Sequence, residues 1–253
     1  MLFRALTHRA LPRATVPARA ASAEAAERHA YWNDLYKSGG DVFTLDGVSV
    51  APNLESFWPK LTAGVTVPSN GVSRCLMPFV GRDISLGWVA RQPKWGAVGV
   101  DFSDAALRML GAELGGLVPL TSGEGAWSAY QCGAVPRALL VHGDFLGMDS
   151  NAFGGSFEAA WDRGGITAAI DRDEYAAALA GALAIKGRAL IELLSTNIQA
   201  VGACAARDIE VSLSRAGFSV ELLLKRDVRA DYPAFRPPGL RELDEIVILA
   251  TKT

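Results

Sequence analysis

The sequence has few of the residues that build metal sites and disulfide frameworks. Its three cysteines, Cys75, Cys132 and Cys204, are far apart and form no C-x-x-C pair, and of its three histidines only His142 lies in the body of the chain. Scattered cysteines in odd number give no disulfide framework, and the histidines give no zinc site. A Ser-His-Asp hydrolase is disfavoured for the same reason. We therefore expect no bound metal.

The sequence also lacks a long hydrophobic run and an excess of charge of one sign. The longest strongly apolar stretch runs from Tyr175 to Ile185, well short of the about 20 residues that a membrane helix needs. The formal net charge of -2 gives no reason to expect a nucleic acid or a membrane as a partner. With 50% hydrophobic and 21% charged residues, the chain has the composition of one folded domain with a sizeable core. We expect it to act as a monomer.

The near-neutral total hides an asymmetry between the first residues and the rest. Residues 1–28 carry five arginines and two acids, a net charge of +3, whereas the remainder is at -5. A basic, acid-poor segment without a continuous apolar stretch is typical of an organelle transit peptide rather than of a secretory signal. We predict a disordered mitochondrial leader over 1–28 and a single domain over 29–253. Import into a plastid, and a basic tail on a cytoplasmic protein, are the alternatives.

Strand-like and helix-like segments alternate along the body. Strands are expected over 74–79, 96–101, 138–141, 157–161, 189–195, 219–228 and 245–251, with a hairpin at 126–133. Helices are expected over 84–91, 173–185 and 204–216, and after Ser103 as an N-cap, and residues 31–38 are expected to end a helix. This alternation predicts an α/β fold, with a mostly parallel sheet and helices on both faces. The last two strands have no helix between them, so we expect an antiparallel end to the sheet.

Four features fall beyond the carboxyl ends of these strands, where such sheets bind ligands. They are the turn Phe79–Arg82, the acid Asp101, and the segments His142–Phe145 and Trp161–Gly164. Asp101 is placed to accept hydrogen bonds from a ribose diol, so the set fits a nucleoside-containing ligand whose charged tail lies at the first turn. The turn lacks a full G-x-G-x-x-G, which disfavours an NAD-linked oxidoreductase.

Each of these residues also has a purely structural interpretation. Asp101 would serve equally to cap the following helix, and Asp144 to hold a turn. Trp161 would be an ordinary core residue, and Asp162 a local ion-pair partner of Arg163. The order of the four features on consecutive strands favours the functional interpretation of the whole set.

The same segments resemble the thiopurine S-methyltransferase family. W-D-R-G-G-I at 161–166, followed by Tyr175, is similar to the family's W-D-R-G/A-A-L. Y-W-N-D-L-Y at 31–36, with Gly39 and Phe43, is similar to its N-terminal W-x-x-x-W/Y…G…F. P-F-V-G-R at 78–82 resembles P-L-C-G-K, V-G-V-D-F-S at 98–103 resembles V-V-G-V/L-E/D-I-S, and G-D-F at 143–145 resembles the G-D-F-F of halide and thiol relatives. The resemblance covers residues 30–253.

The resemblance implies an S-adenosyl-L-methionine-dependent class I methyltransferase with a Rossmann-like, seven-stranded sheet, mostly parallel with an antiparallel terminal strand. Trp32 would cover the cofactor, and Val80 and Gly81 would line its methionine end. Asp101 would hold its ribose, and residues 142–145 would surround its adenine. Arg163 and Asp162 would position the acceptor, the charge of Arg163 favouring a thiolate or another anion. The cofactor-binding residues implied in this way are Trp32, Tyr36, Phe79, Val80, Gly81, Asp101, Phe102, His142, Gly143, Asp144, Phe145 and Trp161.

The departures from the family pattern bear on the acceptor. Val80 and Arg82 stand where the family has Cys and Lys, and the loop 195–202 lacks the proline-rich stretch of the animal enzymes. Methyl transfer from a sulfonium needs alignment and exclusion of water, with few protein groups for the chemistry. We predict methylation of a small thiol or a related sulfur nucleophile. The aromatic residues expected to close the site are Trp32, Tyr36, Phe43, Tyr232 and Phe235.

Two other functions remain open at this point. One is a halide/thiol methyltransferase that produces volatile methyl compounds from a halide or sulfide acceptor. The other is a non-catalytic module that binds S-adenosyl-L-methionine, which the altered first turn at Phe79–Arg82 motivates. Transfer of a labelled methyl group to a panel of acceptors separates these functions.

Overall fold

A computed structural model describes residues 23–38, 48–68, 71–120, 127–147, 155–169, 171–197, 205–232 and 238–253. Residues 1–22 of the leader expected over 1–28 therefore lie outside the described residues, and its mitochondrial role stays a prediction. Helix α2 (Ala23–Lys37) begins before the expected boundary, so residues 23–28 are helical and continuous with the segment 31–38 that was expected to end a helix.

The fold is built on one nine-stranded sheet in the order β3-β4-β5-β2-β1-β6-β7-β9-β8. The pairs from β5 to β7 in this order are parallel, and β9 runs antiparallel to both of its neighbours. The strands are β1 (Ser73–Pro78), β2 (Trp95–Asp101), β3 (Leu117–Pro119), β4 (Ser128–Cys132), β5 (Val135–His142), β6 (Phe157–Arg163), β7 (Leu183–Thr196), β8 (Phe218–Asp227) and β9 (Leu243–Lys252).

Seven of these strands are the expected ones, and the two others extend one edge. β3 and β4 pair antiparallel with each other, and β4 pairs antiparallel with β5. The hairpin expected within 126–133 is therefore formed by β4 with β5, across the turn at Gly133 and Ala134. At the other edge, the antiparallel strand β9 lies inside the sheet, between β7 and the edge strand β8.

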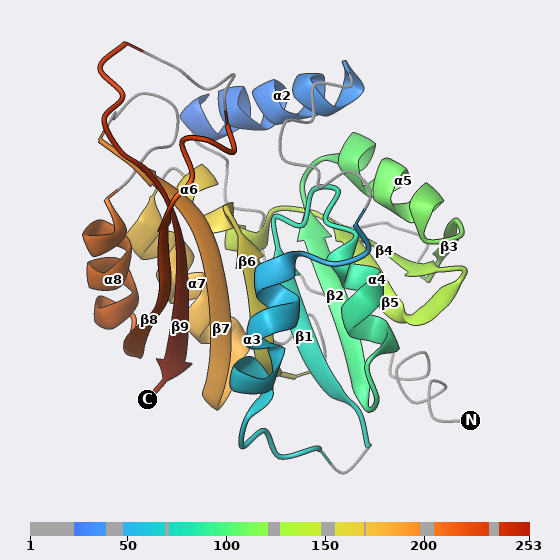
Figure 1. The fold of residues 1–253 in the computed structure, drawn as a ribbon. Coiled ribbons are helices and arrows are strands. Elements are labelled where there is room, and N and C mark those ends of the chain that lie inside the picture. Colours follow the sequence, from blue (N-terminus) through green and yellow to red (C-terminus); the bar gives the residue numbers. More distant parts are fainter. Residues whose placement is uncertain are drawn as a thin grey trace.

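Helices cover both faces of the sheet (Figure 1). One face packs the leucines of α3, α4 and α5 into a core cluster, and the other packs α7 and α8 into a second cluster. Helix α2 lies across the end of the sheet at which β1 and β2 finish. The helices are α3 (Pro52–Thr62), α4 (Ser85–Arg91), α5 (Asp104–Glu113), α6 (Gly165–Ala168), α7 (Arg172–Ala182) and α8 (Ala206–Arg215), with a 3-10 turn at Phe145–Gly147.

Two segments differ from the expected elements. The apolar run after Tyr175 ends its helix at Ala182, because Leu183 is buried as the first residue of β7 and pairs with Phe157. Helix α3 was not among the expected helices, and its sequence holds two prolines. One of these is Pro52 at the first helical position, where the missing N–H leaves no hydrogen bond unmade.

Within the described residues, no helix combines the length and the apolar character that a membrane crossing requires.

The packing of α5 against β3 predicts that alanine is tolerated differently at two helical glycines, one in α5 and one in α7. A Cβ at Gly111 would come within 2.4 Å of the Leu117 side chain, whereas a Cβ at Gly181 of α7 would meet nothing within 4 Å. Gly111→Ala should lower the free energy of unfolding by about 1–3 kcal/mol through overpacking. Gly181→Ala, the matched control, should raise it by about 0.5–1 kcal/mol through helix propensity. Urea unfolding of the two variants measures both; a stabilising Gly111→Ala would contradict this packing.

Candidate functional site

The chain turns sharply after β1, and this first turn is conformationally unusual. Phe79 and Gly81 have positive φ angles of 48° and 51°. Glycine takes such angles freely, but Phe79 is strained there, and strain of this kind clusters at functional sites. A Cβ on Gly81 would lie 2.3 Å from the hydroxyl oxygen of Tyr36. The turn therefore needs glycine, and α2 packs directly on it.

Val80 fixes this turn to the sheet. Its N–H donates to the carbonyl oxygen of Val100 at 3.0 Å, and its side chain is buried in the core cluster of α3 and α4. A Cβ on Gly99 would lie 2.9 Å from Val80 Cγ1, so β2 needs glycine opposite this valine. Val80 was expected to line the methionine end of the cofactor, but its side chain points into the core.

Asp101 ends β2, and its carboxylate joins two turns. Oδ2 accepts the N–H of Gly81 and Oδ1 accepts the N–H of Ser103, each at 2.8 Å. The residue is 4% exposed, and burial raises the pKa of its carboxyl to about 6, although these N–H groups act to lower it. Each carboxylate oxygen retains a lone pair beyond the one used here, so the group can still accept hydrogen bonds from a ligand.

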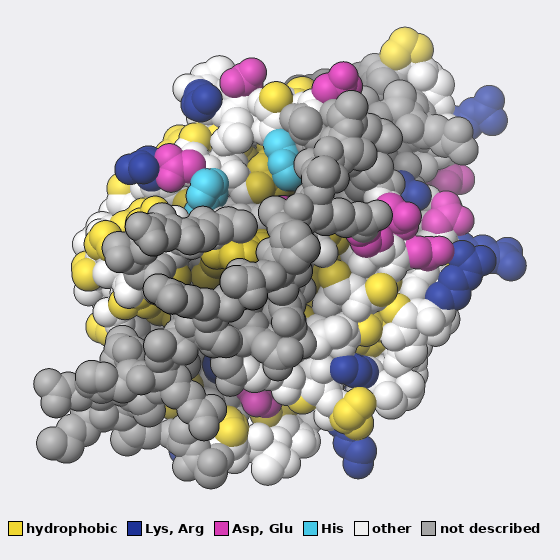
Figure 2. Space-filling model, turned by 180° about the vertical axis from the view of Figure 1, so that it is seen from behind, with side chains coloured by type: hydrophobic (Ala, Val, Ile, Leu, Met, Phe, Trp, Pro, Cys, Tyr) yellow, Lys and Arg dark blue, Asp and Glu magenta, His cyan; other side chains and the backbone are white. Residues whose placement is uncertain are grey.

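Helix α2 is attached to the same end of the sheet. Ser103, the expected N-cap of α5, accepts the N–H of Ala106 at 3.2 Å and donates its hydroxyl to Asn33 Oδ1 at 2.8 Å. The ring of His29 stacks on Phe102, with centroids 4.0 Å apart. Histidine side chains are visible beside hydrophobic ones on the rear face (Figure 2). Trp32, one turn from Tyr36, is half-buried on this helix.

The end of β5 meets the end of β2. The Gly143 N–H donates to the carbonyl oxygen of Asp101 at 2.8 Å, and His142 Nε2 lies at hydrogen-bond distance, 3.0 Å, from the carbonyl oxygen of Phe102. A Cβ on Gly143 would overlap the Trp127 ring, whose Cε3 would be 1.9 Å away. The expected adenine-binding segment is thus held beside Asp101, with an indole packed against its glycine.

Two further residues of that segment have local roles. Asp144 Oδ1 accepts the N–H of Leu146 at 3.0 Å, as the structural interpretation of a turn aspartate required. Phe145 is 2% exposed, and its ring packs at an angle against Phe79 and Tyr175, with centroids 6.1 and 5.5 Å apart. Phe145 therefore supports the first turn from within the core.

Trp161 of β6 also supports the first turn, through a hydrogen bond to Asp83. Its indole Nε1 donates to Asp83 Oδ2 at 2.7 Å, and Asp83 Oδ1 accepts the N–H of Ser85 at the start of α4. Trp161 is 1% exposed, so it is a positioning residue of the turn. Sequence reasoning missed Asp83, although an acid directly before a helix is a recognisable capping signal.

Asp162 points to the opposite face and is held by its own chain. Its carboxylate accepts the N–H groups of Gly165 and Ile166 and the hydroxyl of Tyr175, the last at 2.8 Å. The residue is fully buried, and burial raises the pKa of its carboxyl to about 6. Asp162 was expected to position the acceptor, but these bonds make it the residue that shapes the loop after β6.

Arg163 was expected to favour an anionic acceptor or, in the structural interpretation, to pair with Asp162; in the structure it pairs with Glu192 instead. Its Nε lies 3.0 Å from Glu192 Oε1, and Glu192 Oε2 accepts the side-chain N–H of Asn53 at 2.9 Å. The two side chains are 18% and 11% exposed. Burial raises the pKa of Glu192, while Arg163 acts to lower it. Burial raises the pKa of Tyr232, and the nearby charge of Glu192 also acts to raise it, while that of Arg163 acts to lower it.

Glu192 is the functional candidate that sequence reasoning missed. The signal was present, because this acid interrupts the apolar strand A-L-I-E-L-L at 189–194. An unpaired carboxylate in such a strand would be costly, so a partner was to be expected. The identity of that partner required the register of β6 with β7, in which Arg163 lies opposite Glu192.

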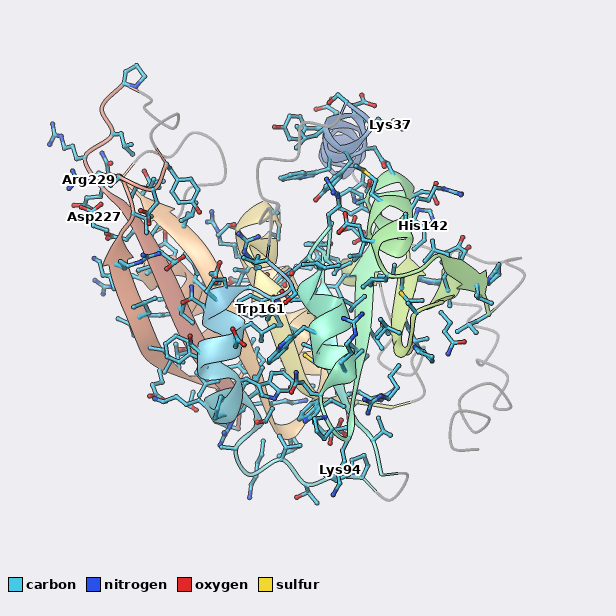
Figure 3. All side chains as sticks on the ribbon, turned by 45° about the vertical axis from the view of Figure 1, so that its right-hand side comes forward. Lys37, Lys94, His142, Trp161, Asp227 and Arg229 are labelled. Carbon is cyan, nitrogen blue, oxygen red and sulfur yellow. The ribbon has the colours of Figure 1, made fainter. Side chains whose placement is uncertain are left out.

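The expected residues therefore gather at one end of the sheet. In Figure 3, His142 lies toward the end where Lys37 of α2 is found, and Lys94 lies at the opposite end. Trp161 lies on β6, between α3 and α4 in that view. Phe43 and Phe235, two of the aromatic residues expected to close the site, lie outside the described residues.

The thiols of the described residues are poorly suited to act as nucleophiles. Cys75 and Cys132 are free and buried. Burial raises the pKa of the Cys132 thiol to about 11 and that of Cys75 further still. Over the same part of the chain, no three His, Cys, Asp or Glu side chains are grouped so as to hold a metal ion.

Comparison with known proteins decides the family. The sequence model described as Thiopurine S-methyltransferase (TPMT) matches residues 27–253. The chain belongs to the thiopurine S-methyltransferase family. It is 30% identical over 202 residues to a thiopurine S-methyltransferase of Pseudomonas putida, covering 78% of this chain and 88% of that one. The chain is accordingly an S-adenosyl-L-methionine-dependent methyltransferase, as the resemblance of its motifs implied.

Solved structures confirm the class I methyltransferase fold of this family member. The geranyl diphosphate C-methyltransferase of Streptomyces coelicolor superposes with a TM-score of 0.59 at 12% identity, covering 92% of this chain and 100% of that one. The phosphoethanolamine N-methyltransferase 2 of Haemonchus contortus, in complex with S-adenosyl-L-methionine, superposes with a TM-score of 0.58 at 13% identity. The match covers 87% of this chain but 57% of that one, so the chain spans little more than half of the worm enzyme.

The hydrogen bond between Tyr175 and Asp162 predicts a pH dependence of the free energy of unfolding. The folded pKa of Asp162, about 6, lies above its unfolded value, so stability falls as the pH rises between about 4 and 6. The Tyr175 hydroxyl limits this loss, because it stabilises the carboxylate. Tyr175→Phe should lower the free energy of unfolding at pH 7 by about 1.5–3 kcal/mol, and by less at pH 5.

Urea unfolding of the Tyr175→Phe variant at the two pH values measures this effect. The matched control is Tyr130→Phe on β4, which should change the stability by less than about 0.5 kcal/mol. An equal loss at both pH values would show that the hydroxyl does not act through the Asp162 carboxylate.

Proposed function

We propose that this methyltransferase transfers the methyl group of S-adenosyl-L-methionine to the sulfur of a small thiol. The observation that carries the cofactor part is the Asp101 carboxylate, held by the N–H groups of Gly81 and Ser103 where the parallel strands end. Membership of a family named for an S-methyltransferase supports sulfur as the accepting atom.

The residues at the end of β1 and β2 fit S-adenosyl-L-methionine. Asp101 would accept the ribose hydroxyls through its remaining lone pairs, and the backbone of Phe79–Gly81 would lie along the methionine part. His142, Gly143 and Phe102 would flank the adenine, since they adjoin Asp101 on the neighbouring strand end. Trp32 and Tyr36 of α2 would cover the cofactor.

Methyl transfer requires little of the protein beyond placing the acceptor and the cofactor relative to each other. When bound, the cofactor would supply a methyl group activated on a sulfonium. The acceptor sulfur would bond to the methyl carbon in line with the breaking carbon–sulfur bond, whose electron pair would remain on the cofactor sulfur, and the thiol proton would pass to solvent. The chain must hold the acceptor on that line and keep water out. Arg163, Glu192 and Tyr232 would border the acceptor. Arg163 is the last residue of β6 and is paired with Glu192 of β7, and Trp161 of the same strand bonds to Asp83 of the first turn.

The cofactor assignment predicts the effect of Asp101→Asn. An amide cannot accept hydrogen bonds at both of its polar atoms, so it loses either the Gly81 or the Ser103 bond and one ribose contact. Binding of S-adenosylhomocysteine, followed by calorimetry, should weaken about 10- to 100-fold, as for the loss of a hydrogen bond to a charged group. Asp208→Asn, an exposed acid on α8, should leave the affinity unchanged. Unchanged affinity in Asp101→Asn would contradict the assignment.

The thiol assignment predicts the products of a methyl-transfer assay. With methyl-labelled S-adenosyl-L-methionine and a panel of small thiols, thiopurines, sulfide and halides, label should appear in thioether products. If label appeared only in methyl halides, the proposed thiol methyltransferase would have to be replaced by a halide methyltransferase. Tight cofactor binding with no transfer to any acceptor would overturn the proposed function in favour of a binding module.

A further inference from the structure

The ion pair between Arg163 and Glu192 lies at the place where the proposed function needs its acceptor. The two residues are register partners on neighbouring parallel strands, near the carboxyl end of β6. Arg163 lies two residues beyond Trp161 and so shares its face of the sheet, and Trp161 bonds to Asp83 of the first turn. The pair is therefore beside the turn at which the methyl donor is proposed to lie.

The pair is shielded from solvent without being sealed. The exposed fractions of the two side chains, 18% and 11%, are low enough to exclude most water and high enough to leave atoms accessible to a small molecule. Asn53, at the start of α3, holds the second oxygen of Glu192, so the carboxylate is fixed on two sides. Tyr232, half-buried before β9, lies within range of both charges.

Among the described residues, the positive charge of Arg163 is balanced by the carboxylate of Glu192. The guanidinium of Arg163 is matched by the carboxylate 3.0 Å from it. The next acid on that side, Glu245 of β9, is itself paired with Arg226 at 3.1 Å. An anion entering beside Arg163 would therefore also meet the Glu192 carboxylate, in surroundings where charges are weakly screened.

We infer that Glu192 is a specificity-determining residue that makes the acceptor site select uncharged thiols over thiols that carry a negative group. This inference rests on the proposed function, and it assigns a substrate class within it. Arg163 acts as the partner that keeps Glu192 ionised and in place. The sequence expectation that Arg163 attracts an anionic acceptor is replaced by selection for a neutral one.

The test compares two small acceptors, neutral 2-mercaptoethanol and anionic mercaptoacetate, by their kcat/KM values at pH 8, each corrected for the fraction of thiolate present. The wild-type chain should prefer 2-mercaptoethanol by at least about tenfold, a modest share of the repulsion between two charges near a protein surface. Glu192→Gln keeps the shape and removes the charge. It also gives up one of the two hydrogen bonds, because the amide nitrogen cannot accept from Arg163 or Asn53. The substitution should shift the ratio toward mercaptoacetate by about tenfold or more.

Two further variants separate charge from structure. Glu192→Asp retains the carboxylate and should keep the wild-type preference even if its turnover falls. Glu221→Gln removes an equivalent charge from an exposed ion pair, also made with α3 through Lys60, and should change neither ratio nor rate. An unchanged ratio in Glu192→Gln, or the same shift in Glu192→Asp, would overturn the inference.

A binding measurement distinguishes failure of this inference from failure of the proposed function. NMR titration of each thiol into the protein saturated with S-adenosylhomocysteine reports acceptor binding when no transfer can occur. The wild type should bind 2-mercaptoethanol more tightly than mercaptoacetate, and Glu192→Gln should reverse or abolish the difference. If no thiol of the acceptor panel is methylated, the proposed function fails; if 2-mercaptoethanol and mercaptoacetate bind equally well both in the wild type and in Glu192→Gln, the inference fails.

Discussion

One buried carboxylate, that of Asp101, connects the elements on which this site depends. It accepts the N–H of Gly81 in the first turn and the N–H of Ser103 at the start of α5. Its backbone carbonyl accepts the N–H of Gly143 at the end of β5. Because Ser103 in turn bonds to Asn33, the same acid also orients α2 over the sheet. Three strand ends and the covering helix therefore share a single anchor.

Of the remaining polar groups at this end of the sheet, some hold the loops in place and others keep enough exposure to contact a substrate. Asp83 and Asp162 are bonded by their own chain and fix the loops after β1 and β6, with Trp161 joining the two strands. The Arg163 and Glu192 pair is different, since both side chains keep some exposure. Protein groups at this end thus serve mainly to place ligands, which suits a donor that brings its own reactivity.

Most of the fold was predictable, because local patterns decide it. Apolar runs marked the seven principal strands, and Ser103 marked its helix as a cap. The partners of side chains were not predictable, because they join residues far apart in the chain. Trp161 bonds to Asp83 and Arg163 to Glu192 only through the order of the strands. Trp161, for example, was expected at the cofactor, and its indole instead bonds to Asp83 of the first turn.

The most direct test of the account is backbone hydrogen exchange of the whole chain with and without S-adenosylhomocysteine. If Asp101 anchors the cofactor site, the ligand should slow exchange in residues 79–82, 101–103 and 142–145 and in α2, while the amides of α7 and α8 on the far face change little. Slowed exchange confined to other segments, with 79–82 and 101–103 unaffected, would contradict it.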